Sequence, residues 1–296
     1  MSTTLSSLQI YEHIKACTTI SSCLIKKVRQ KSRLINFIYD VLNVALGIRV
    51  AHLVDITFLT YEETSMLIAS LRQKISQIYA IQFSDTHTFI YNRDLLLTKL
   101  DQDLNNKFKD IIFINVSKEN IEPKQVNAPN SLMHLLNTQI CPFIKESKES
   151  KETNSVLFIS QTPQCIISFT GWILEYHVIY VLERTSEFSY EESSFELQSI
   201  MKNCLENQEL KLYKIFLKKF NYNFNKEIQR HMLLSFSCPA KIVNSLNNSF
   251  NIQPNNDIIS IRLNNTFVSR IERNQSFWNK GWELEINDVC LPVVVL

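Results

Sequence analysis

The segment 33–63 places the strongest constraint on how this chain can fold. Apolar residues recur at three- and four-residue spacing over 34–45, which predicts a helix with one buried face. Gly47 follows at once, and a glycine there can adopt the left-handed conformation that ends a helix. The mainly apolar run 50–56 then has the length of a strand. A helix, a buried strand and a second helix in close succession are typical of a sheet covered by helices.

The second helix of this unit has its own start signal. Thr60 and Glu63 have the Ser/Thr-x-x-Glu spacing, in which each side chain bonds to a backbone N–H of the other residue. Leu67, Leu71 and Ile75 continue on one helical face. The pattern therefore predicts a capped helix directly after the strand.

Composition excludes several functional classes. The chain has 296 residues, of which 45% are hydrophobic and 20% charged, and only three are glycine. Neither the G-x-G-x-x-G pattern nor the P-loop pattern occurs, so the common nucleotide-binding classes lack their phosphate loop. A formal charge of +2 gives no global field that favours nucleic acid. We therefore expect no bound cofactor and no nucleic-acid partner.

The cysteines and the N-terminus indicate the compartment. Seven cysteines lie scattered without C-x-x-C pairs, and the histidines have no zinc-site spacing. No signal-peptide region and no run of membrane-spanning length is present. These features predict a soluble protein with reduced thiols, in the cytoplasm or alternatively the nucleus, with no metal site and no membrane partner.

The rest of the chain predicts an N-terminal helical segment over 1–31, followed by a single α/β domain over 32–296. We expect a mixed, mostly parallel sheet flanked by helices, with a mobile charged loop at 145–153 (KESKESKET). The segment 78–91 is either one bent strand or a hairpin that turns at 84–87. Further strands are predicted at 111–116, 156–160, 178–182, 210–220 (near an edge) and 232–236, and helices at 93–108, 162–171, 194–205 and 265–280.

Four residues are candidates for a binding pocket: Asp55, Asp85, Ser160 and Gln161. Ligands of open α/β sheets bind beyond the carboxyl ends of the strands. Asp55 follows the first predicted strand, and Ser160 and Gln161 follow a later one. The alternative is that these residues cap helices or stabilise turns.

Two other groups allow more than one interpretation. Lys26, Lys27, Arg29, Lys31 and Arg33 form a basic cluster, which is either a solvated helix end or a site for nuclear import or an anionic partner. Cys165, His177 and His231 could supply a thiol nucleophile with a base, although no spacing requires it.

Three places in the chain resemble one known family. The first place is the helix end 45–49 (ALGIR) together with the strand end 53–55 (LVD). The second is the strand end 233–239 (LLSFSCP), and the third is the C-terminal part, 284–286 (LEI) and 291–296 (LPVVVL). Together they resemble the animal family named for human chromosome 1 open reading frame 74, a domain of unknown function. The resemblance spans 34–296, which implies one domain, and it brings no established activity, cofactor or catalytic residue.

Two functional classes remain. The favoured hypothesis is a non-catalytic module that binds a protein partner, supported by the apolar tail 289–296. The alternative is an enzyme or small-ligand binder with a strand-end pocket around Asp55.

Overall fold

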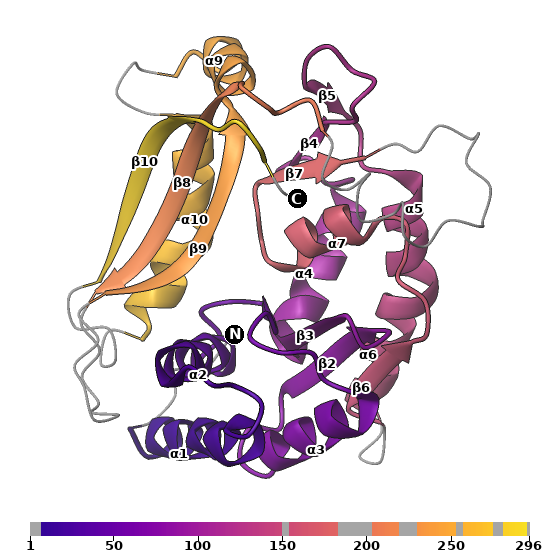
Figure 1. Cartoon of the computed structure of the whole chain (residues 1–296), viewed down its shortest axis with the longest axis vertical. Helices are drawn as coiled ribbons and strands as arrows, with labels where there is room; N and C mark the ends of the chain where they lie inside the picture. Colours follow the sequence, from indigo (N-terminus) through magenta and orange to yellow (C-terminus); the bar gives the residue numbers. More distant parts are fainter. Residues whose placement is uncertain are drawn as a thin grey trace.

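The computed structural model describes residues 7–149, 154–182, 203–218, 230–252, 257–274 and 281–294. Helices and strands both contribute throughout these ranges, so the predicted α/β class is confirmed (Figure 1). The described helices are α1 (Ser7–Leu24), α2 (Lys31–Ala45), α3 (Tyr61–Arg72), α4 (Arg93–Asn105), α5 (Asn130–Leu135), the π-helix η1 (Leu136–Ile140), α6 (Cys141–Glu149), α7 (Ile166–Ile173), α9 (Ala240–Ser249) and α10 (Ile258–Glu272). The described strands are β1 (Ala51–Leu53), β2 (Ile78–Phe83), β3 (His87–Asn92), β4 (Ile112–Asn115), β5 (Lys124–Val126), β6 (Val156–Ile159), β7 (Val178–Val181), β8 (Glu209–Lys218), β9 (Arg230–Pro239) and β10 (Trp282–Cys290).

The described strands form three sheets rather than one. Their orders are β1-β3-β2-β6, β10-β8-β9 and β5-β4-β7. Five of the seven described strand pairs are antiparallel, and only β2–β6 and β4–β7 are parallel. The expectation of mixed pairing is therefore confirmed, but the expectation of mostly parallel pairing is wrong. Short connections such as the turn between β2 and β3 can join only antiparallel strands.

The sheet β1-β3-β2-β6 brings three strand ends to one edge. β3 is antiparallel to both β1 and β2, and β6 is parallel to β2. Since β1, β2 and β6 all run in the same direction, their carboxyl ends meet at the same edge of the sheet. We call this edge the strand-end edge.

The helix stops and starts around β1 form as the sequence predicts. Gly47 has φ +69°, and the amides of Gly47 and Ile48 donate to the Val44 and Asn43 carbonyls at 3.1 and 2.9 Å. These two bonds close the last turn of α2 in a Schellman motif. At the other side, the Thr60 hydroxyl and the Glu63 carboxylate form the predicted capping box of α3.

The core lies on both faces of the strand-end sheet. Ile78 and Ala80 of β2 belong to a cluster of buried residues that also includes residues of α1, α2, α3 and the sheet β10-β8-β9. Tyr79, Ile81 and Phe83 point the other way and pack with α4, α6 and α7. This alternation is the pattern of a strand that is covered on both faces.

Helix α10 connects its own sheet with the other two. Three polar residues of the helix and Asn274, just beyond its end, follow one another at four-residue spacing, and each bonds to a group outside the helix. In order, Arg262 donates to the Asp110 carbonyl (2.9 Å), Thr266 contacts His177 (3.0 Å), Arg270 contacts Glu175 (2.7 Å) and Asn274 donates to the Leu46 carbonyl (3.3 Å).

Several predicted boundaries are wrong. The tract 145–153 is not wholly a loop, because α6 extends to Glu149 with Ser147 buried; residues 150–153 lie outside the described residues. The helix expected to end at Gly171 continues to Ile173. A Cβ added to Gly171 would lie 3.3 Å from Ile179, so this glycine allows α7 to pack closely on β7.

The last part of the chain differs most from expectation. β8 is the central strand of its sheet rather than near an edge, and β10, which the sequence did not predict, pairs with it. α10 occupies 258–272 instead of 265–280. The helix predicted over 194–205 lies outside the described residues except for 203–205, which are not helical.

Candidate functional site

The structure places the four predicted pocket residues at the strand-end edge. Asp55 follows β1, Asp85 lies in the turn after β2, and Ser160 and Gln161 follow β6. The Ser84 amide donates to the Ile159 carbonyl at 2.8 Å, so the turn lies against the end of β6. All four side chains are exposed. Their placement at one edge follows from the strand directions, whereas their role stays a prediction.

A cavity of about 290 Å³ lies at the β1 end of this edge, and we call it the strand-end pocket. Asp55 is one of its lining residues, whereas Asp85, Ser160 and Gln161 are not. The remaining lining residues are Leu53, Val54, Ile56, Thr57, Phe58, Thr86 and His87. The Thr86 hydroxyl lies 2.8 Å from His87 Nδ1, so the polar groups of the wall are partly bonded to one another.

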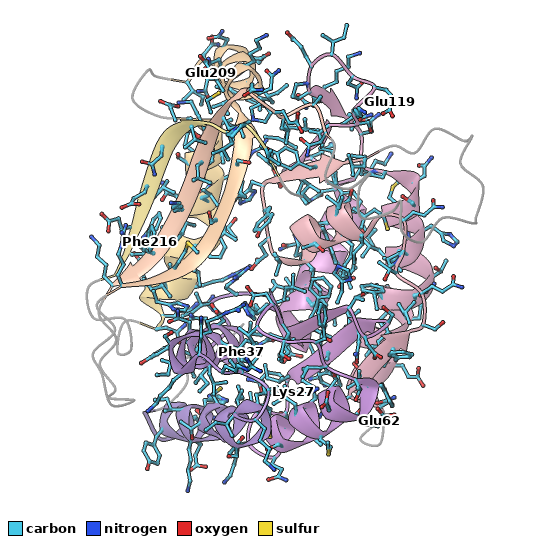
Figure 2. The ribbon with its side chains drawn as sticks, in the orientation of Figure 1. Lys27, Phe37, Glu62, Glu119, Glu209 and Phe216 are labelled. Carbon is cyan, nitrogen blue, oxygen red and sulfur yellow. The ribbon has the colours of Figure 1, made fainter. Side chains whose placement is uncertain are left out.

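The loop that carries Asp55 is held through its backbone. Arg33 donates to the Asp55 carbonyl at 3.1 Å, Lys27 to the Phe58 carbonyl at 3.4 Å, and Gln82 to the Leu59 carbonyl at 2.7 Å. Lys27 lies near the start of α3 (Figure 2). The Asp55 carboxylate itself makes no hydrogen bond or ion pair with another described residue. It therefore faces solvent on a fixed backbone.

Two aromatic side chains are exposed at the strand-end edge. Phe58, which lines the pocket, is 71% exposed, and Phe158 of β6 is 41% exposed. Phe158 packs edge-on against Tyr61 at a centroid distance of 5.4 Å. Exposed aromatic side chains next to a hollow are typical of protein-interaction surfaces.

A second polar group, which the sequence did not indicate, joins α2, β1 and β9. Asp40 Oδ1 lies 3.0 Å from His231 Nε2, and Asp40 Oδ2 lies 3.8 Å from His52 Nε2. The side chains of Asp40, His52 and His231 are 16%, 12% and 4% exposed. We call these three residues the acid–histidine cluster.

Burial and neighbouring charges set the ionisation of the cluster. Burial acts to raise the pKa of Asp40, but His52, His231 and Arg49 together lower it below its ordinary value. Burial lowers the pKa of His52, while the carboxylates of Asp40 and Asp55 act in the opposite direction. At neutral pH the cluster therefore holds a carboxylate beside a neutral His52 imidazole. His52 directly precedes Leu53, which lines the strand-end pocket, so the cluster and the pocket share β1.

The chemistry open to the cluster is limited. A carboxylate with two imidazoles could in general transfer protons or bind a transition metal. Among the residues that the structure describes, however, no group of three His, Cys, Asp or Glu side chains is arranged to hold a metal ion. None of the three residues lines the strand-end pocket either. The cluster joins three elements that are distant in the chain.

The hypothetical thiol nucleophile is not assembled. His177 contacts Thr266 at 3.0 Å, and burial lowers its pKa to about 4. His231 contacts Asp40, and burial raises the pKa of Cys165. Each residue therefore has a different partner, and among the described contacts neither histidine bonds to Cys165.

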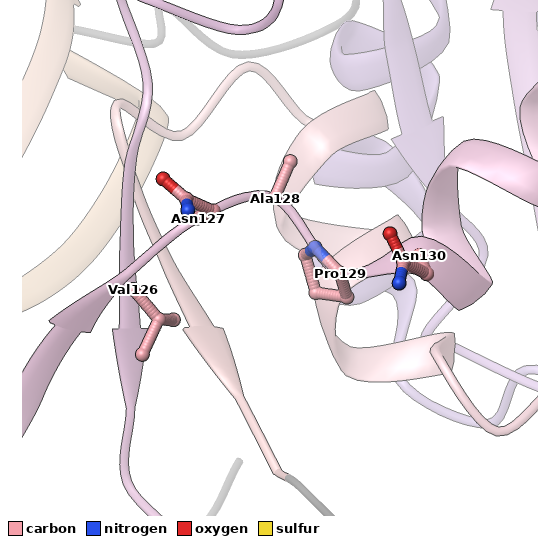
Figure 3. A pocket seen from close by; sticks show the side chains of 5 residues that line it. All are labelled: Val126, Asn127, Ala128, Pro129 and Asn130. Carbon is pink, nitrogen blue, oxygen red and sulfur yellow. The ribbon is translucent and has the colours of Figure 1, made fainter.

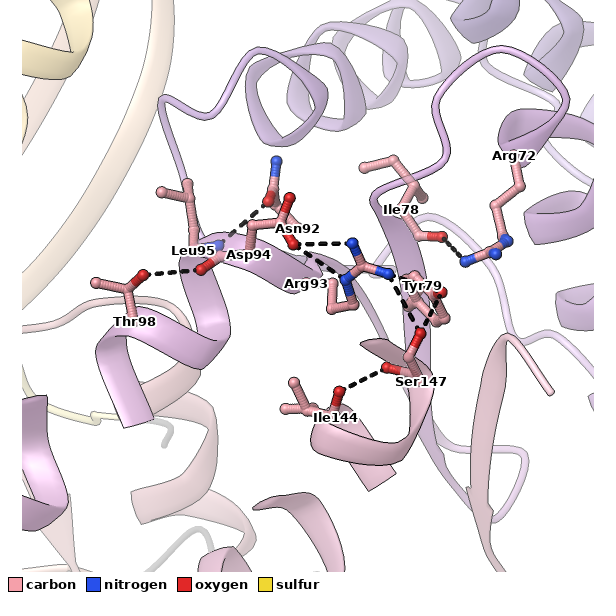
Figure 4. A network of polar contacts seen from close by, with 10 residues as sticks. All are labelled: Arg72, Ile78, Tyr79, Asn92, Arg93, Asp94, Leu95, Thr98, Ile144 and Ser147. Carbon is pink, nitrogen blue, oxygen red and sulfur yellow. Dashed lines mark hydrogen bonds and ion pairs between the residues drawn. The ribbon is translucent and has the colours of Figure 1, made fainter. Parts of the chain in front are cut away.

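Two other features are structural. A cavity of about 460 Å³ between β5 and α5 is lined by the five consecutive residues 126–130, none of them titratable (Figure 3). The guanidinium of Arg93 donates to Asp94, the Tyr79 hydroxyl and the Ser147 carbonyl, and so joins α4, β2 and α6 (Figure 4). Neither feature lies at the strand-end edge.

The fold and this edge define a mixed α/β protein with a pocket at the end of β1, and the exposed Phe58 lies on the wall of that pocket. A family model described as a domain of unknown function (DUF4504) matches residues 19–288. The match covers most of the chain, which therefore belongs to this family. Comparisons with curated proteins and with solved structures found no match. None of the described helices combines the length and apolar character needed to cross a membrane.

Proposed function

We propose that this protein is a non-catalytic protein-interaction module and that the strand-end pocket with Phe58 is its binding site. The observation that carries this proposal is the 71% exposure of Phe58 on the wall of the pocket. Removing an aromatic side chain from water is favourable, so a partner that covers Phe58 would bind more tightly because of that contact.

The size of the pocket favours a protein partner over a metabolite. Its volume of about 290 Å³ is at the bottom of the roughly 300–1,000 Å³ range of small-molecule sites. A cavity of this size accommodates one apolar side chain of a partner protein. Other residues of the partner would contact Phe58 and the residues next to it.

A second candidate function is a small-ligand binder or enzyme that uses Asp55 as a pocket acid. The specific observation in its favour is that the carboxylate is exposed in the pocket and unbonded to other described residues. A cationic group on a small ligand would find a free carboxylate there.

We also infer a reducing compartment, the cytoplasm or the nucleus, and membership of the family named for human chromosome 1 open reading frame 74. All seven cysteines are free, which supports the first inference. The segments ALGIR, LLSFSCP and LPVVVL support the second.

Photocrosslinking tests the proposed site. A photoreactive phenylalanine analogue is placed at Phe58 or, as a control, at Ile121, which is 92% exposed and remote from the pocket. We expect one discrete adduct from position 58 in cells and none from position 121. Equal labelling at both positions, or no adduct at position 58, would reject the protein-interaction site. A thermal-shift screen of metabolites on wild type and Asp55→Asn tests the second candidate.

A further inference from the structure

The basic cluster of the sequence lies beside the proposed binding site. Lys26, Lys27, Arg29, Lys31 and Arg33 belong to the connection between α1 and α2 and the first turn of α2. Lys27 and Arg33 donate to the carbonyls of Phe58 and Asp55. The segments 26–33 and 55–58, which are distant in the sequence, therefore form one continuous surface.

The charges of this segment point outward. All five cationic residues are exposed, whereas Leu24 and Val28 are buried and anchor the segment to the core. Lys27 is paired with Glu63, but Lys26, Arg29 and Lys31 make no ion pair with a described residue. Ile25 next to them is 63% exposed. The surface thus combines unneutralised positive charge with exposed apolar side chains.

We propose that this surface binds an acidic segment of a partner protein. An apolar side chain of the segment enters the strand-end pocket against Phe58, and its carboxylates face Lys26, Arg29 and Lys31. This inference rests on the proposed function and adds the chemistry of the partner. Complementary charge of this kind raises association rates and selects the partner.

The acids at the edge argue against phosphate-rich partners. Asp55 lies in the pocket and Asp85 in the neighbouring turn, and both are exposed. A nucleic-acid backbone or an anionic bilayer presents negative charge over a wide area, so it would approach these carboxylates as well as the lysines. A peptide can place an apolar or neutral residue at Asp55 and its acids elsewhere.

Peptide selection tests the inference. A random library of displayed 16-residue peptides is selected on the immobilised full-length protein, and the affinities of the enriched peptides are measured by fluorescence anisotropy. We expect enrichment of Asp and Glu around an apolar residue. Binding should weaken as NaCl is raised from about 50 to 300 mM, because salt screens exposed charges.

Three variants locate the contact. The triple change Lys26→Glu, Arg29→Glu and Lys31→Glu spares the two side chains that support the loop, and we expect it to weaken binding at least about tenfold. Phe58→Ala should have a similar effect. The matched control reverses three exposed, unpaired lysines elsewhere (Lys109, Lys118 and Lys124) and should leave the affinity within about twofold. Thermal melting verifies that each variant is folded.

The outcomes separate the two proposals. If the selected peptides need Phe58 for binding but not the basic cluster, the acidic-partner inference is wrong and the proposed interaction site is retained. Peptides that need neither, or no enrichment at all, would count against both. Tighter binding to vesicles containing phosphatidylserine or to a 20-base oligonucleotide than to the selected peptides would overturn the inference in favour of those partners.

Discussion

Asp40 Oδ1 lies 3.0 Å from His231 Nε2, although 191 residues separate the two in the chain. The contact joins α2 to β9, and His231 is only 4% exposed. Without this contact the Nε2 atom of the buried imidazole loses a hydrogen bond that offsets its desolvation. The contact is therefore a long-range contribution to stability.

Asp40→Ala should lower the free energy of unfolding by about 1–3 kcal/mol, in the range for a buried polar atom that loses a hydrogen bond. Urea denaturation measures the loss. Asp101→Ala, an exposed change on α4, should remain within about 0.5 kcal/mol. Asp40→Ala combined with His231→Ala should cost less than the sum of the single losses, because both remove the same contact. Strict additivity would contradict this account of the pair.

His177 should make the protein less stable in mild acid. Burial lowers its pKa from an ordinary 6.5 to about 4. The unfolded chain therefore binds this proton first, and the free energy of unfolding falls as the pH drops below about 6.5. Between pH 7 and pH 5 the loss from this group is roughly 2 kcal/mol.

The variant His177→Gln should remove that part of the pH dependence, while a glutamine can still bond to Thr266. Urea denaturation at pH 7, 6 and 5 measures the difference. His134→Gln, at an exposed position, serves as the control and should keep the wild-type profile. Identical profiles for wild type and His177→Gln would show that His177 titrates normally.

Gly47→Ala should lower the free energy of unfolding by about 1 kcal/mol, because φ at this position is +69°. Gly47→Asn should cost less, since asparagine adopts the left-handed conformation more readily. Thermal unfolding of the two variants compares them directly. An equal loss for both would mean that the volume of the side chain, rather than the backbone conformation, decides the effect.

Local signals in the sequence predicted local structure well. Gly47 and the pair Thr60–Glu63 each act on backbone groups a few residues away, and both form the expected caps. The placement of Asp55 and Ser160 at one edge was also predictable. That placement needs only that β1 and β6 run in the same direction, whichever strands lie between them.

Long-range relationships could not be predicted in the same way. Nothing in the residues around Asp40 indicates that His231 will meet it. In the sequence Gly171 resembles a helix stop. In the structure it lies inside α7, where the close approach of Ile179 explains why a glycine stands there. The sequence of β10 does not look like a strand because it is rich in acidic residues. These acids are accommodated because they pair with Lys211, Lys218 and Arg230 on the other strands of the sheet.

Asp55 and Thr60 belong to the same connection between β1 and α3, but their side chains have different roles. Asp55 is exposed and its side chain bonds to no described residue, so Asp55→Asn should change the free energy of unfolding by less than about 0.5 kcal/mol. Thr60 caps α3, so Thr60→Ala should cost about 1 kcal/mol. Chemical denaturation of both variants measures these values.

A loss of 1 kcal/mol or more for Asp55→Asn would mean that its carboxylate has a structural role. If Asp55→Asn is neutral for folding but abolishes the thermal shift given by a cationic metabolite, Asp55 is a pocket acid and the second candidate function gains over the first.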